Sequence, residues 1–123
     1  MMMALVFAAA LQAELPPSSV TLSPVPDPVL SRLLDGVALD RVGVVIHDRG
    51  EFFFPGGRYV VQGRATSVGR YRVSGSRICT RIREYPEKCF RIFTDNRGRL
   101  FSDDMFKDGH VSEVRFVPVL SGR

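Results

Sequence analysis

GRYRVSGSRICTRIREYPEKCFRIF, residues 69–93, alternates apolar and polar side chains over much of its length. This alternation is typical of β-strands with one buried face. Ser74-Gly75 has the composition of a two-residue hairpin turn. Cys79 and Cys89 are the only cysteines, and a pair ten residues apart does not make a metal motif of the C-x-x-C kind. In an oxidising compartment such a pair is most simply a disulfide, so we expect two hairpins braced by a Cys79–Cys89 bridge.

These two hairpins can be given a register. The turn places Arg72 opposite Arg77 in the first hairpin, and the disulfide places Ile78 opposite Phe90 in the second. Alternation then collects an apolar face of Tyr71, Val73, Ile78, Thr80, Ile82, Phe90 and Ile92. The opposite face collects both cysteines, Phe93, Arg70, Arg72, Arg77, Arg81, Arg83 and Arg91. The register that permits the disulfide also produces a consistent apolar face, which supports both assignments.

The six arginines make the second face a possible anion-binding site. Residues 58–99 hold ten arginines and Lys88 against Glu84, Glu87 and Asp95, a net charge of +8. Arginine binds phosphate and carboxylate groups bidentately, so phosphate, polysaccharide, lipid headgroups or nucleic acid are candidate ligands. Nucleic acid would also need aromatic side chains for stacking, and Phe93 alone is thin support.

The alternative for the same face is a solvated surface, which is the commoner role of charged side chains on a sheet. Its guanidinium groups would then pair with nearby carboxylates rather than with a ligand. The candidate partners are Glu51, Glu84, Glu87, Asp103 and Asp104. Both interpretations stay open at this point.

The first residues bear on the compartment. Residues 1–13, MMMALVFAAALQA, are apolar and small, which resembles the core and cleavage end of a secretory signal. We expect removal after Ala10 or Ala13, and with the cysteine pair this predicts a periplasmic or secreted protein. The alternative is a short N-terminal strand or helix that docks on the core. No apolar run approaches the ~20 residues of a membrane-spanning helix, so no transmembrane span is expected.

The chain of 123 residues is long enough for one domain, which we expect at 27–123. Residues 14–26 are rich in proline and predict an extended linker. A short helix follows, with Asp27 as N-cap, Pro28 at its first position and Gly36 as its C-terminal cap. Strands are expected at 42–47, 51–54, 58–62, 67–73, 76–83, 88–94, 98–102 and 112–117.

No catalytic motif is present. The chain lacks a G-x-S-x-G elbow, an H-E-x-x-H zinc motif and a phosphate loop, and paired cysteines are not nucleophiles. His47-Asp48 and Asp108-Gly109-His110, with Asp103 and Asp104, could form a metal or acid–base site if the fold brought them together. Neighbouring carboxylates in a polar loop more often face solvent, so we expect no catalytic residues, no metal and no cofactor.

GRYRVSGSRIC, followed by CFRIFTDNRGRLF, resembles a pattern in small exported proteobacterial proteins of uncharacterised function. The matching positions are Gly69, Tyr71, Val73, Gly75, Cys79, Cys89, Phe90 and Gly98. The resemblance covers about a third of the chain and implies a small β-meander or lipocalin-like sheet without known catalytic residues. A second resemblance is to periplasmic inhibitors of lysozyme, which are also small disulfide-bearing β-barrels. Their Ser-Gly inhibitory loop has no convincing match, since Ser74-Gly75 fits a hairpin turn better.

The sequence thus predicts a mainly β domain. We expect an antiparallel meander or partly closed small barrel, with one short N-terminal helix and one disulfide. The predicted function is an exported, non-enzymatic binding module whose partner is an anionic ligand or an envelope protein. One alternative is an inhibitor of a cell-wall or host hydrolase, acting through the loop at 84–88 or at 103–110. The other is polyanion or nucleic-acid binding through the arginines.

Overall fold

The computed structural model describes residues 21–43, 50–103 and 110–119, which form a mainly β fold. Its strands are β1 (Ser23–Pro24), β2 (Val37–Arg41), β3 (Gly50–Phe54), β4 (Arg58–Gln62), β5 (Thr66–Ser74), β6 (Arg77–Arg81), β7 (Lys88–Thr94), β8 (Leu100–Ser102) and β9 (Ser112–Pro118). The helix α2 (Asp27–Leu33) precedes β2. Within the described ranges, no helix has the length and apolar character needed to cross a bilayer.

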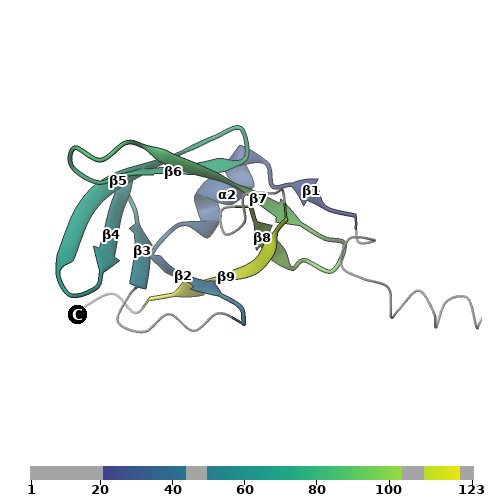
Figure 1. Cartoon of the computed structure of the whole chain (residues 1–123). Helices are drawn as coiled ribbons and strands as arrows, with labels where there is room; N and C mark the ends of the chain where they lie inside the picture. Colours follow the sequence, from purple (N-terminus) through teal and green to yellow (C-terminus); the bar gives the residue numbers. More distant parts are fainter. Residues whose placement is uncertain (1–20, 44–49, 104–109, 120–123) are drawn as a thin grey trace, which may run out of the picture.

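The sheet closes on itself, as Figure 1 shows. Its strands follow the order β7-β6-β5-β4-β3-β2-β9-β8, and β8 returns to pair with β7, so eight antiparallel strands form a barrel. The short β1 adds to β7, with Ser23 opposite Thr94. The predicted mainly β class, the helix and the disulfide are confirmed, and the sheet is a closed barrel rather than an open meander. Closure removes the exposed strand edges that an open sheet would present.

The core gathers around Phe53, which is fully buried on β3. Its ring lies 5.1 Å from that of Tyr59, 5.2 Å from that of Tyr71 and 6.4 Å from that of Phe116, measured between centroids. Rings at these tilted and edge-on angles combine apolar burial with favourable quadrupole contacts. The remaining buried core residues are Val25, Leu30, Leu34, Val37, Ile78, Phe90, Ile92 and Val114.

The helix is fixed to the first hairpin by Asp27. Asp27 was expected to cap the helix, but the N-cap is Pro26 and no side chain caps there. The two carboxylate oxygens of Asp27 instead accept hydrogen bonds from the backbone N–H groups of Gly75 (3.0 Å) and Ser76 (2.6 Å). Both turn residues have a φ of +62°, the left-handed values of a type I′ turn. The turn thus directs two N–H groups to one carboxylate, which joins α2 to the barrel.

The register of the first hairpin differs from the prediction. The turn is Gly75-Ser76 rather than Ser74-Gly75, so Arg72 lies opposite Cys79 and not opposite Arg77. Because the shift moves each partner by two positions, every side chain keeps its predicted face. The second hairpin has the predicted register, with Cys79 opposite Cys89. The loop between these strands turns at residues 82–85, where the Tyr85 N–H donates to the Ile82 carbonyl.

Two predicted boundaries also change. The strand expected at 42–47 is wrong for its first two residues, because β2 ends at Arg41 and residues 42–43 form a turn. Residues 44–49 lie outside the described residues. The expected linker at 14–26 includes residues that belong to the domain, since β1 pairs with β7 and Val25 is 2% exposed. Residues 1–20, including the expected signal, lie outside the described part of the chain.

Replacing Asp27 with Ala should lower the free energy of unfolding by roughly 1–3 kcal/mol, because two hydrogen bonds to an ionised acceptor are lost. The matched control is Ser31→Ala, an exposed change on the same helix that should stay within about 0.5 kcal/mol of the parent. Urea unfolding followed by circular dichroism measures both. Equal stability of the two variants would show that the hydrogen bonds from the turn to Asp27 do not stabilise the fold.

Candidate functional site

The arginine face occupies the outside of β4–β7. Five of the predicted arginines are exposed on β5, β6 and β7: Arg70, Arg72, Arg77, Arg81 and Arg91. Arg83 departs from the prediction, since β6 ends at Arg81 and Arg83 lies in the following turn with a φ of +48°. Beside this strand end, the backbone of β6 approaches Gly69 so closely that a Cβ there would collide with the Arg81 carbonyl. These five residues, together with Arg58 on the neighbouring strand β4, are here called the arginine face.

The face contains directly opposed like charges. Arg58 on β4 lies opposite Arg70 on β5, which lies opposite Arg81 on β6, so three arginines cross three strands in one row. Arg77 and Arg91 form a second opposed pair, between β6 and β7. Arg58 was missed from the sequence because no register had been derived for the β4–β5 hairpin. Like charges at directly opposite positions are destabilising, so this arrangement carries a cost.

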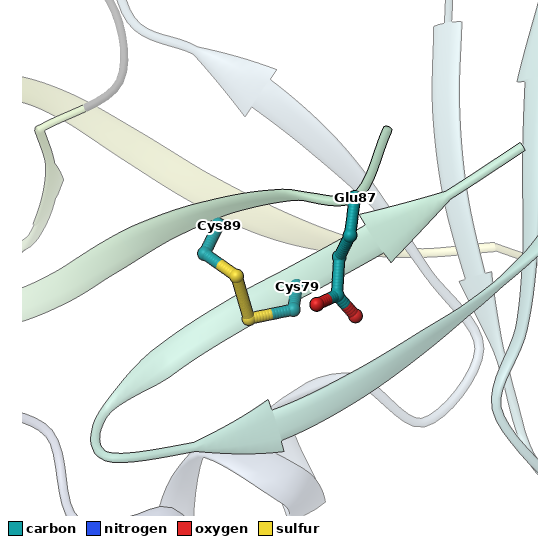
Figure 2. Close-up of side chains that lie close together, drawn as sticks. All are labelled: Cys79, Glu87 and Cys89. Atoms are coloured by element: carbon teal, nitrogen blue, oxygen red, sulfur yellow. A yellow bond between two sulfur atoms is a disulfide. The ribbon is translucent and has the colours of Figure 1, made fainter. Parts of the chain in front are cut away.

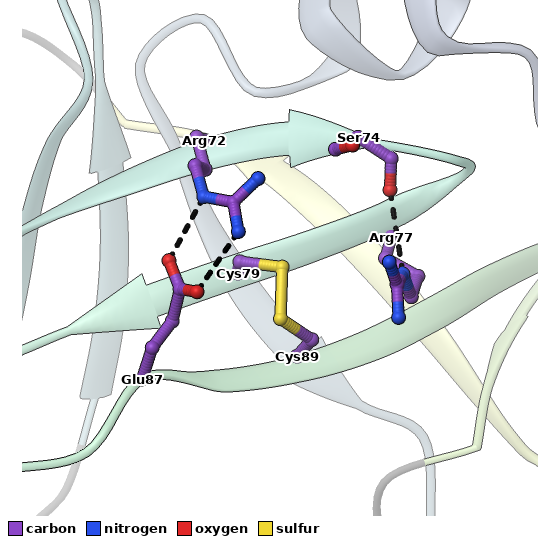
Figure 3. Close-up of polar contacts among 6 residues, drawn as sticks. All are labelled: Arg72, Ser74, Arg77, Cys79, Glu87 and Cys89. Carbon is purple, nitrogen blue, oxygen red and sulfur yellow. Dashed lines mark hydrogen bonds and ion pairs between the residues drawn. A yellow bond between two sulfur atoms is a disulfide. The ribbon is translucent and has the colours of Figure 1, made fainter.

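One arginine of the face is neutralised. Arg72 donates from Nε and Nη2 to the two carboxylate oxygens of Glu87, both at 2.9 Å, as Figure 3 shows. The hydrogen bond and the charge of Arg72 lower the pKa of Glu87 despite an opposing contribution from desolvation, and the same pairing raises the pKa of Arg72. Glu87 therefore stays ionised well below neutral pH. Because the pair is exposed, it contributes little to stability, but it does hold Arg72 in place.

The other arginines of the face use weaker contacts. Arg70 donates to the Gly56 carbonyl at 2.9 Å, and Arg77 donates from Nε to the Ser74 carbonyl at 3.4 Å. The guanidinium carbon of Arg58 lies 5.6 Å from the centroid of the Phe54 ring. A guanidinium has five N–H donors, so each of these side chains keeps donors for a ligand. Among the described residues, the ion pair of Arg72 is the single salt bridge on the arginine face.

The expected carboxylate partners are largely committed elsewhere. Glu51 points into the barrel, where its carboxylate lies 3.4 Å from Arg41 Nη2 and accepts a 2.7 Å hydrogen bond from the Tyr59 hydroxyl. The side chains of Arg41 and Glu51 are 8% and 16% exposed, so this pair belongs to the interior. Asp103 accepts from the backbone N–H of Arg91 at 2.8 Å rather than from its guanidinium. Strand alternation beside the buried Phe53 could have placed Glu51 inside from the sequence alone.

The disulfide sits in the middle of the arginine face. Cys79 and Cys89 are directly opposite, bonded through sulfur, with Cα atoms 4.0 Å apart. Figure 2 shows the Glu87 carboxylate beside them, and the three side chains could be taken for a metal-binding group. The sulfurs are bonded to each other, however, so neither is a thiolate that could bind an ion. The disulfide instead braces β6 and β7 beneath the charges.

Most of the acid–base candidates fall outside the part of the chain that the structure describes. His47, Asp48, Asp104 and Asp108 lie outside the described residues. His110 is exposed. The loop predicted as an inhibitory segment at 103–110 is likewise described only at its two ends.

Comparison with known proteins finds no matching family model, no matching curated protein and no matching solved structure. The resemblances to small exported proteins and to lysozyme inhibitors therefore stay predictions. Function has to be inferred from the arginine face itself.

Removing the disulfide should destabilise the protein without unfolding the sheet. Closing the loop from Cys79 to Cys89 stabilises by at most ~2.8 kcal/mol in the chain-entropy model, and less here because the hairpin already restricts the loop. The paired variant Cys79→Ala/Cys89→Ala should show a lower urea midpoint and an unchanged β-type circular dichroism spectrum. Reductant should lower the midpoint of the parent and leave that of the variant unchanged. Loss of the β spectrum, or no change in midpoint, would contradict this account of the bridge.

Proposed function

We propose that this protein is an exported, non-enzymatic binding module that holds an anionic ligand on its arginine face. The observation that carries the proposal is the row Arg58–Arg70–Arg81, in which three guanidinium groups lie side by side without a salt bridge to the described residues. Mutual repulsion in such a row is relieved when an anion lies across it. A ligand would therefore supply the charge that the protein leaves out.

The shape of the face suits a ligand with several anionic groups. Directly opposite positions on neighbouring strands are about 5 Å apart, so the row spans roughly 10 Å. Arg77 and Arg91 continue the positive charge on the far side of the disulfide. A single small anion would occupy one part of this surface, whereas a polyanion or an array of headgroups would engage the whole row. The closed barrel keeps the strands, and with them the spacing of the arginines, fixed.

Export is the second part of the proposal. Disulfides form and persist in oxidising compartments, and the Cys79–Cys89 bridge supports a periplasmic or secreted location together with the apolar residues 1–13. In that setting the available polyanions are carbohydrates and lipid headgroups. Nucleic acid is less well supported, because Phe54, the aromatic side chain in line with the arginine row, is half-buried and already contacted by the Arg58 guanidinium.

Inhibition of a hydrolase is the second candidate, and one observation favours it. Tyr85 is 63% exposed in the loop between β6 and β7, next to Pro86 and close to the disulfide. An exposed aromatic side chain on a braced loop is a suitable element to enter an enzyme cleft. This candidate requires no contribution from the arginine row, so the following experiment separates it from the main proposal.

Binding to immobilised heparin should be measurable at low salt and should weaken as the salt concentration rises, because each neutralised sulfate releases counterions. The triple variant Arg58→Gln/Arg70→Gln/Arg81→Gln should reduce the slope of log affinity against log salt by about three. The control Arg32→Gln/Arg97→Gln/Arg115→Gln removes the same charge from exposed sites outside the arginine face.

Surface plasmon resonance across a salt series gives both slopes, and circular dichroism verifies the fold of each variant. Selective loss in the first variant supports the proposal. Equal loss in both variants would show that net charge alone drives binding. Absence of binding at low salt would leave the arginine row a solvated surface and favour the hydrolase-inhibitor candidate.

A further inference from the structure

An apolar row crosses the outside of the barrel beside the arginine row. Val117 lies opposite Ala38, Ala38 opposite Phe52, Phe52 opposite Val60, and Val60 opposite Val68. These five residues, here called the apolar row, therefore form an uninterrupted line over β9, β2, β3, β4 and β5. Their sequence neighbours Val37, Phe53 and Tyr59 point into the core, and alternation places the apolar row on the outer surface.

The two ends of the apolar row, Val68 and Val117, are exposed to solvent. Val68 is 47% and Val117 44% exposed, the largest values among the valines that the structure describes. Ala38 and Phe52 are half-buried, and Val60 in the middle is 7% exposed although it is not part of the interior core. The outer face of a small barrel is normally polar, so five consecutive apolar cross-strand positions call for an explanation.

Charge lies along one border of this row. The next positions along β3, β4 and β5 are Phe54, Arg58 and Arg70, which are also directly opposite one another. The rings of Phe52 and Phe54 stack at 6.4 Å, and Arg58 lies against the second of them. An apolar line, an aromatic side chain and a line of arginines are thus adjacent on one surface. This is the order of chemistries met on passing from the acyl chains of a bilayer into its anionic headgroups.

We infer that the ligand of the arginine face is the surface of an anionic lipid bilayer, with Phe52 and Val68 of the apolar row entering the acyl boundary and Arg58, Arg70 and Arg81 binding headgroup phosphates. Val117 on β9 lies four strands away from Val68 in the closed barrel of eight strands, on the opposite side, and stays outside this contact. The inference rests on the proposed function and names its ligand class. A soluble polyanion would use the arginines and leave the apolar row in water. A bilayer binds the arginines and also buries the apolar side chains, because these side chains leave water at the depth where the neighbouring guanidinium groups meet phosphate.

The absence of tryptophan from the chain permits a direct test of insertion. In Val68→Trp the only indole stands at the exposed end of the apolar row, and in the control Val29→Trp it stands on α2, where Val29 is 39% exposed. With vesicles of phosphatidylcholine and 30% phosphatidylglycerol, the emission of Val68→Trp should shift to shorter wavelength and that of Val29→Trp should not. Vesicles of phosphatidylcholine alone should leave both unchanged.

Vesicle co-sedimentation then separates the two chemistries. Each arginine near an anionic surface strengthens binding about fivefold, so the triple arginine variant should bind roughly 100-fold more weakly. Val68→Ser should reduce vesicle binding roughly fivefold and leave heparin binding unchanged, whereas Val117→Ser, a similarly exposed change on the opposite side of the barrel, should leave both unchanged. Circular dichroism and the urea midpoint verify that the variants fold.

The outcomes distinguish failure of the lipid inference from failure of the proposed function. Heparin binding without vesicle binding, or vesicle binding that Val68→Ser leaves unchanged, would overturn the lipid inference and leave the proposed function standing. Self-association that is lost in Val68→Ser would show that the apolar row joins two copies of the chain, which also overturns it. Binding to neither heparin nor vesicles would overturn the inference and the proposed function together.

Discussion

The pairing of Cys79 with Cys89 determines which side of β6 and β7 faces water. In a strand, successive side chains point to opposite sides, so fixing one pair across two strands fixes all the others. With the cysteines outside, Ile78 and Phe90 must enter the core, and Arg77 and Arg91 must leave it. The disulfide, the core and the positive surface are therefore consequences of a single register.

Sequence alternation predicts faces more reliably than it predicts partners. The first hairpin turns one residue later than Ser74-Gly75 indicated, yet Arg70, Arg72 and Arg81 remain on the outside because partners change in steps of two. Arg83 was misplaced because alternation does not report where a strand ends, and β6 ends at Arg81. A small barrel was one of the two expected arrangements, but its full closure depends on the β2–β9 pairing, which joins strands distant in the chain.

The candidate site was predicted in part. Five of its arginines follow from residues 69–93, whereas Arg58 requires the β4–β5 register that completes the row. The role of Asp27 was also hidden, because an aspartate before Pro28 fits a helix cap equally well. Its contact with the Gly75-Ser76 turn exists only once α2 has docked on the barrel. Local propensity identified these residues as special without identifying their partners.

The electrostatic arrangement separates an inner carboxylate from the outer arginines. Glu51 is engaged by Arg41 and Tyr59 inside the barrel, and Asp103 is held by a backbone N–H. Glu87 forms its ion pair with Arg72 and also lies within electrostatic reach of Arg77 and Arg81. The most direct test is an NMR titration of labelled protein with a heparin oligosaccharide, following the arginine Nε–H resonances. The account predicts the largest shifts at Arg58, Arg70 and Arg81. Shifts concentrated at Tyr85 and the loop around it, with these arginines unmoved, would contradict it.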